Sequence, residues 1–247
     1  MAEFKNQRMQ ESLFHHVDLS RSRFRDVDLT GIQIDDAYLV DVVINADIKN
    51  VRINDVDVAP LVEAELDRRY PERVKLRPID ADGFREAWTV IEELWLPTVA
   101  NARDFPPELL HERVDGEWSF IETLRHLVFA TDAWINRAVL EDSNPYHALG
   151  LAHDEIADEP TIPCDRDARP SLDEILAVRA DRMATVRELV DNATDEFWTG
   201  MTEPVPPPGY PASESFPVRE CVLVILDEEW AHRRYAERDL AKLSSHG

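Results

Sequence analysis

Three polar side chains stand at positions where the surrounding sequence predicts a buried core. His126 lies in a mostly apolar segment with Leu124, Leu127, Val128, Phe129 and Ala130, and Glu228 and His232 follow the apolar run CVLVIL. Because helix residues four apart project from the same face, Glu228 and His232 would lie one turn apart, a spacing at which one helix gives two ligands to a metal ion. Two imidazoles and one carboxylate would leave a tetrahedral zinc ion one open position, at which water or an ionised thiol could bind.

The same residues also have a structural explanation. A histidine in an apolar segment is more often a hydrogen-bonded core residue than a ligand, and a Glu and a His four apart on a charged helix are usually a surface pair. Glu229 is an alternative carboxylate, at a less favoured three-residue spacing from His232. His147 and His153 are expected in a solvated loop. The residues alone leave both interpretations open, and iron or nickel would suit the same ligands as zinc.

Four apolar-striped segments are predicted to form the helices that position these residues. They span residues 81–104, 119–140, 171–192 and 217–242. The second and third segments each begin with Ser and have Glu three residues later, which is the pattern of a capping box. No strand pattern occurs from residue 60 onward, so the content predicts a four-helix bundle. The two long connections, 142–170 and 194–216, are of a length that often covers a pocket.

The N-terminal part of the chain repeats every five residues. Bulky apolar residues recur from Phe14 to Ile44, smaller residues lie two positions before most of them, and the pattern resumes after a one-residue slip from Ile48 to Val58. A period of five fits neither a helix nor a strand. The segment resembles the pentapeptide-repeat family, and this implies a short right-handed β-helix whose apolar positions both point inward.

Two segments around the candidate ligands resemble a second family. DGEWSFIETLRHLVFATDAW at residues 115–134 and EEWAHRRYAERDL at residues 228–240 are similar to the DinB-like superfamily of four-helix metalloproteins. Members supply one His from the second helix and a His-x3-His pair from the fourth, and Glu228 stands where the first His of that pair would fall. This departure resembles the branch of mycothiol-dependent maleylpyruvate isomerase, which binds zinc with a His, a Glu and a His. The resemblance thus implies that His126, Glu228 and His232 bind the metal.

The two resemblances predict a mainly α chain in three parts. A pentapeptide-repeat β-helix covers residues 1–58, a helical linker residues 59–80, and a DinB-like four-helix bundle residues 81–247. The implied function is that of a zinc-dependent transferase or isomerase that uses a low-molecular-weight thiol of the mycothiol type on a small-molecule substrate. A non-catalytic, metal-stapled bundle serving in binding or assembly is the alternative, and DNA mimicry by the repeat is a third. No catalytic residue is assigned.

Three aromatic residues are weaker candidates for substrate contact. Trp118 and Trp134 flank the segment that contains His126, and Tyr235 follows His232 by three residues. Aromatic residues at helical spacing are usually part of the core, so their proximity in sequence gives only a prediction.

Composition narrows the classes of partner. The net charge is −23, which repels nucleic-acid phosphates and anionic lipids. Residues 1–58 carry seven Lys and Arg against eleven Asp and Glu, so most of the acidity lies outside the repeat and DNA mimicry is disfavoured. We expect a homo-oligomer, because the open ends of a repeat need a neighbour to cover them.

Cysteine content and hydropathy give the remaining expectations. The two cysteines lack a CxxC partner, which excludes a disulfide scaffold and a cysteine-ligated zinc finger. The longest apolar run, from Cys221 to Leu226, is far shorter than the roughly 20 residues that cross a bilayer. The first ten residues lack the apolar stretch of a signal peptide. We therefore predict a cytoplasmic protein with no membrane partner.

Overall fold

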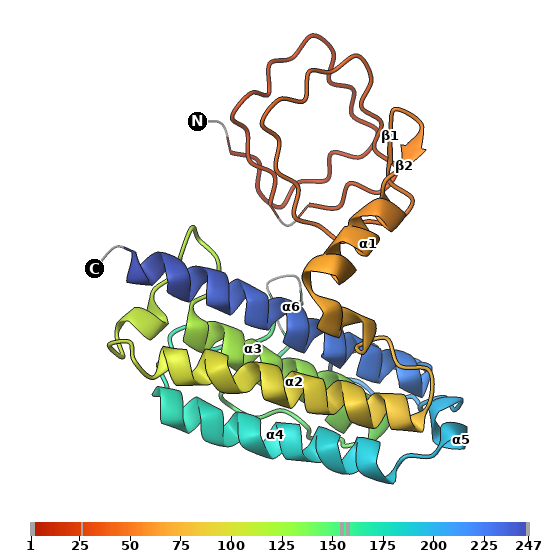
Figure 1. Cartoon of the computed structure of the whole chain (residues 1–247), viewed down its shortest axis with the longest axis vertical. Coiled ribbons are helices and arrows are strands. Elements are labelled where there is room, and N and C mark those ends of the chain that lie inside the picture. Colours follow the sequence, from red (N-terminus) through yellow and green to blue (C-terminus); the bar gives the residue numbers. More distant parts are fainter. Residues whose placement is uncertain (1–2, 26, 154–155, 157–158, 246–247) are drawn as a thin grey trace. The chain divides into compact units, whose positions relative to one another are not determined.

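The chain divides into two compact units. The computed structural model describes residues 3–25, 27–153, 156 and 159–245 (Figure 1). The first unit ends at Ile48 and the second begins at Lys49. The domain boundaries predicted after residues 58 and 80 stay predictions.

The first unit has a five-residue period in its backbone. Positive φ angles occur at residues 6, 11, 16, 21, 31, 36 and 41. Hydrogen bonds close turns at ten-residue intervals, from Ser12 N to Met9 O, from Ser22 N to Leu19 O and from Ile32 N to Leu29 O. In Figure 1 the trace of this unit winds in successive coils, coloured red to orange. The backbone therefore follows the periodicity of the sequence.

The apolar side chains of this unit are nevertheless exposed. Residues 3–25 and 27–48 contain no helix or strand and no buried side chain; Phe14 keeps 57% of its surface and Leu19 keeps 46%. The apolar positions that the resemblance places inside are therefore not buried. A few coils give each side chain too few neighbours to bury it. A β-helix is thus not shown, and membership of the pentapeptide-repeat family stays a prediction.

A hairpin and a short helical region open the second unit. β1 (Arg52–Ile53) and β2 (Val56–Asp57) pair antiparallel, and the two residues between them, Asn54 and Asp55, have φ angles of 49° and 65°. Asn and Asp tolerate this conformation, which two-residue hairpin turns require. The slipped end of the repeat therefore forms a hairpin. α1 (Ala59–Arg69) and the 3-10 helix η1 (Pro71–Val74) follow.

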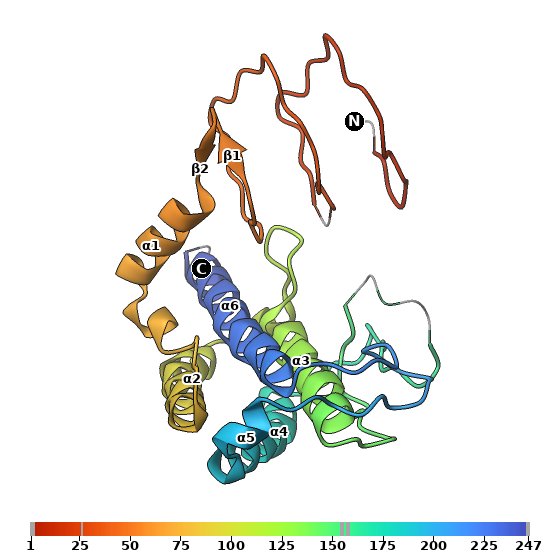
Figure 2. The same cartoon turned by 90° about the vertical axis from the view of Figure 1, so that its right-hand side faces the viewer.

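Four long helices form the bundle. They are α2 (Ala81–Ala102), α3 (Phe120–Thr131), α4 (Leu172–Asn192) and α6 (Val218–Ser244), and both predicted capping boxes are present at the starts of α3 and α4. α2 and α3 each contact both α4 and α6 (Figure 2). The prediction of a helical bundle is confirmed. Among the described residues no helix is long and apolar enough to cross a membrane.

From residue 81 onward, three features of the described residues were not predicted. The 3-10 helix η2 (Leu109–His111) and the short helix α5 (Asp195–Trp198) lie in the connections, and α3 continues as a π-helix, η3 (Asp132–Val139). Single π turns inside α-helices often lie at functional sites.

α3 is the most enclosed helix of the bundle. Every residue from Phe120 to Thr131 is buried, including the polar residues Arg125 and His126. Apolar side chains of the other helices surround it, among them Trp88, Ile175, Val186 and Ile225. Because buried polar groups must find partners within the protein, the contacts of Arg125 and His126 decide what this part of the fold does.

Candidate metal centre

The structure brings His126 of α3 together with Glu228 and His232 of α6. The Nε2 atom of His126 lies 3.2 Å from Oε2 of Glu228, and Nε2 of His232 lies 2.9 Å from the same oxygen. The three potential ligand atoms all lie within 4.8 Å of one another. Two ligands of a tetrahedral zinc ion are about 3.3 Å apart for bonds of about 2.0–2.1 Å. The two distances to Glu228 are thus close to the spacing that one such ion requires, and the two histidine nitrogens lie within 4.8 Å of each other.

The orientation of α6 follows from its sequence. The run from Cys221 to Leu226 places its apolar side chains in the core, and the following turns present Glu228 and His232 toward α3. Glu229 points to α4, where Arg179 Nη1 and Nη2 donate to its carboxylate oxygens at 3.1 and 2.9 Å. The alternative carboxylate is therefore fully engaged in a buried ion pair, and Glu228 is the one beside the histidines.

A backbone carbonyl determines which nitrogen of His126 carries the proton. Nδ1 lies 3.2 Å from the carbonyl oxygen of Leu151. A carbonyl only accepts hydrogen bonds, so Nδ1 carries the proton in this contact, and in the neutral ring Nε2 then presents a lone pair toward Glu228. An ionised carboxylate also only accepts. Two acceptors 3.2 Å apart need a cation or a shared proton between them.

The environment favours the ligand forms of both groups. Burial lowers the pKa of His126 because it disfavours the charged imidazolium, and the nearby His232 acts in the same direction. Burial alone would raise the pKa of Glu228, but its side-chain contacts with His126 and His232 outweigh burial and hold that pKa below its ordinary value. At neutral pH the site therefore combines a neutral imidazole with a carboxylate, which are the forms that bind metals.

Two of the three predicted aromatic residues adjoin the centre. The ring centroid of Trp118 lies 4.5 Å from that of His126 and 5.9 Å from that of His232. Tyr235 meets His232 edge-on at 5.8 Å and keeps 45% of its surface exposed. Trp134 packs elsewhere, against Tyr210 and Phe216. A role in substrate contact stays a prediction for all three.

The loop histidines do not join the centre. The backbone N–H of His147 donates to Asp132, and its Nδ1 accepts from the N–H of Leu149. His153 packs edge-on against Tyr210. Sequence reasoning missed the Leu151 carbonyl, since a backbone atom has no residue signature.

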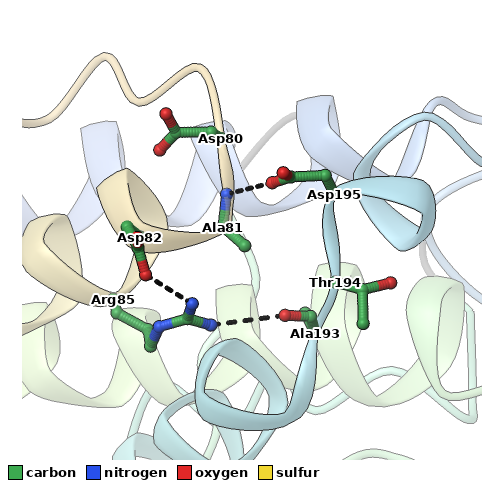
Figure 3. A pocket seen from close by; sticks show the side chains of 7 residues that line it. All are labelled: Asp80, Ala81, Asp82, Arg85, Ala193, Thr194 and Asp195. Carbon is green, nitrogen blue, oxygen red and sulfur yellow. Dashed lines mark hydrogen bonds and ion pairs between the residues drawn. The ribbon is translucent and has the colours of Figure 1, made fainter.

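A pocket at the start of α2 offers a contrast. Its polar groups bind one another: Asp195 accepts from the N–H of Ala81 at 2.7 Å, and Arg85 donates to Asp82 at 2.6 Å and to the carbonyl of Ala193 at 3.3 Å (Figure 3). Such mutually bound groups close the helix terminus and the ends of neighbouring segments. This pocket therefore has a structural explanation.

Comparison with known proteins agrees with the helical fold. No curated protein and no solved structure matches the chain. The profile of a family described as the DinB superfamily matches residues 57–236, which include α1, α2, α3, α4, the larger part of α6 and the three residues of the candidate centre. Proteins of this family often bind a metal. The chain therefore belongs to the DinB superfamily.

Proposed function

We propose that the protein binds one divalent metal ion, with zinc as the expected metal, through His126, Glu228 and His232. We further propose that it acts as a metal-dependent thiol transferase or isomerase on a small molecule, with a mycothiol-type thiol. One observation carries the metal proposal: Nδ1 of His126 lies against the Leu151 carbonyl and Nε2 lies against the Glu228 carboxylate, so a neutral ring with one N–H can satisfy only one of these two acceptors.

The donor set fits the proposed ion. One carboxylate and two imidazoles are borderline ligands that suit zinc, and iron or nickel would accept them as well. When bound, a divalent metal with a free coordination position acidifies a thiol or water molecule and so supplies a nucleophile at neutral pH.

Accessibility supports an open rather than a structural site. Among the residues that the structure describes, only three His, Cys, Asp or Glu side chains gather here. Structural zinc sites usually have four protein ligands, whereas catalytic sites keep one position for an external group. The side chains of Glu228 and His232 are 32% and 20% exposed, while that of His126 is 7% exposed. A substrate would therefore approach from the side of α6, beside Trp118 and Tyr235.

Cobalt substitution tests the open position. Co²⁺ in place of zinc gives a visible spectrum that depends on its ligands, and a thiol should change that spectrum when it joins the coordination shell. We expect a new sulfur-to-cobalt charge-transfer band on titration with a low-molecular-weight thiol. The His126→Ala variant, which should lose the cobalt, is the control. A cobalt spectrum that does not respond to any thiol would contradict the catalytic proposal and favour a structural metal.

The second candidate function is assembly, and the first unit favours it. Large apolar side chains from Phe14 to Ile44 are exposed there, and exposed apolar surface of this extent usually marks an interaction site. In this candidate a metal staples the bundle and the repeat holds copies of the chain together. Acidic DNA mimicry gains no support from these apolar side chains.

Deleting residues 1–48 tests the assembly candidate. Light scattering should then show a smaller oligomer, while the metal content per chain stays unchanged because its ligands lie on α3 and α6. If the shortened chain keeps the parent's oligomeric state, the repeat does not hold the copies together.

A further inference from the structure

We infer that Arg125 is a positioning residue of the metal centre. It fixes the loop that carries Leu151, so that the Leu151 carbonyl selects the tautomer of His126 in which Nε2 is free to bind a metal. The consequence for metal affinity rests on the proposed function, but the consequence for the tautomer does not.

The guanidinium of Arg125 binds the loop from inside the protein. The side chain is fully buried, and its acceptors are four backbone carbonyls. Nε donates to Leu149 O at 2.9 Å, Nη1 to Ala168 O at 3.2 Å, and Nη2 to the carbonyls of Gly150 and Asp165. Burying a charged group this deeply is costly unless its hydrogen bonds are made. The loop and the arginine therefore depend on each other.

Leu151 is held at both of its backbone atoms. The N–H of Leu151 donates to the carbonyl of Arg125 at 3.1 Å. The carbonyl of Leu151 accepts from Nδ1 of His126, the residue after Arg125, at 3.2 Å. The side chain of Arg125 binds the two residues that precede Leu151. The same helical residue thus fixes the loop through its side chain and its backbone, directly beside the metal-site histidine.

Two further contacts restrict the loop. Asp132, at the start of the π-helix, accepts from the N–H of His147 at 2.8 Å and is itself held by Arg182 at 2.6 Å. A Cβ atom added to Gly150 would lie 3.1 Å from the carbonyl oxygen of His147 and 3.0 Å from Cγ of Pro163. The two hydrogen bonds of Asp132 hold the loop at His147, and the space around Gly150 is too small for a larger residue.

A partner of this kind usually has a measurable effect on a metal site. When a ligating histidine donates its other N–H to a fixed acceptor, the ring is held in one tautomer and one orientation. Loss of such a partner typically reduces metal affinity by about 10–100-fold. Arg125 does not contact the ring of His126 itself. Its removal would act by releasing the loop that holds the Leu151 carbonyl against Nδ1 of His126.

The test compares two buried arginines of the full-length chain. Arg125→Met removes the donors to the Leu151 loop. Arg137→Met is the matched control, because Arg137 is also buried and donates to loop carbonyls, those of Val205 and Pro206 at 3.1 and 2.9 Å, in a different connection. Both variants should lower the melting temperature. Only Arg125→Met should reduce zinc affinity, measured by competition with a chelator, by about 10-fold or more.

A second readout needs no metal. Nitrogen-15 NMR of the metal-free chain reports which ring nitrogen of His126 is protonated, and we expect Nδ1–H alone in the parent and in Arg137→Met but a mixture of tautomers in Arg125→Met. If the parent binds no zinc, the proposed function fails while this readout still tests the inference. If Arg125→Met does not fold, Gly150→Ala, which crowds the same loop, should shift the same two measurements. An unchanged tautomer and affinity in the variant that folds, or an equal loss of affinity in Arg137→Met, would overturn the inference.

Discussion

Glu228 and Glu229 are adjacent in α6, but their carboxylates lie on different faces of the helix and have different neighbours and different exposure. On the α4 face, Glu229 is almost fully buried and forms two hydrogen bonds with Arg179, whose guanidinium also lies 4.7 Å from the ring centre of Trp95. On the α3 face, Glu228 is partly exposed and its neighbours are the two histidines.

The difference separates a structural group from a binding group. Glu229 has a permanent positive charge as its partner, so its contact is complete within the protein. Glu228 faces two imidazoles, and burial lowers the pKa of one of them, His126, so we propose that a cation completes its contact. Adjacent residues of the same type thus have different roles because of what the neighbouring helices present to them.

The largest expected effect comes from removing a histidine on the α3 face. His126→Ala or His232→Ala should reduce zinc affinity by more than about 100-fold, which exceeds the loss typical of an outer partner. His147→Ala and His153→Ala should retain zinc, because neither side chain lies in the group of three. Metal analysis of the four purified variants checks this. Equal zinc content in all four would show that the metal, if any, is bound elsewhere.

Removing the carboxylate of Glu228 and removing that of Glu229 should have opposite effects on zinc affinity and on stability. Glu228→Ala should weaken zinc binding with little loss of stability. Glu229→Ala should leave a buried arginine without its partner and destabilise the fold by about 3–5 kcal/mol, while zinc affinity stays close to that of the parent. Chemical denaturation and chelator competition on both variants measure the two effects. A loss of zinc in Glu229→Ala alone would mean that the roles are reversed.

The stability of the metal-free chain should depend on pH through His126. Its lowered pKa means that the unfolded chain binds a proton there at a higher pH than the folded chain does. The stability due to the neutral ring is therefore present above the ordinary pKa of about 6.5 and is lost as the pH falls below it. Between pH 8 and 5 the melting temperature should fall more steeply for the parent than for His126→Asn. Parallel curves would contradict the lowered pKa.

The smallest effect is expected for Glu228→His. An imidazole at this position would replace one borderline ligand with another, and it matches the His-x3-His pair that the family resemblance implies. Zinc affinity should stay within about tenfold of the parent, a change of about 1.4 kcal/mol. Isothermal titration measures it directly. A complete loss of zinc would mean that the site depends on a carboxylate rather than on any ligand at this position.

The bundle was predictable because the sequence patterns that specify its helices are local. Apolar stripes and the capping boxes at Ser119 and Ser171 gave the helix starts to within a residue. The π-helix that extends α3 could not be predicted, since it is accompanied by contacts of Asp132 with Arg182 and with the backbone of His147, which come from distant segments.

The site was predictable only in part. A four-residue spacing brought Glu228 and His232 to one face, but helical spacing alone does not exclude Glu229; Arg179, from another helix, does so. The Leu151 carbonyl could not be found at all from side-chain chemistry. In the repeat, the five-residue period recurs in the backbone, but Phe14 and Leu19 are exposed rather than inside, because burial requires neighbours that a short stretch does not supply.

The central claim is that a metal ion completes the group of His126, Glu228 and His232. X-ray absorption at the zinc edge, on the zinc-loaded full-length chain, tests it most directly because it reports the type and distance of the ligands. The account predicts one zinc ion per chain, with the scattering pattern of two imidazoles and nitrogen or oxygen ligands at about 2.0–2.2 Å. A chain that retains no stoichiometric zinc, or a zinc ion surrounded by oxygen ligands alone, would contradict it.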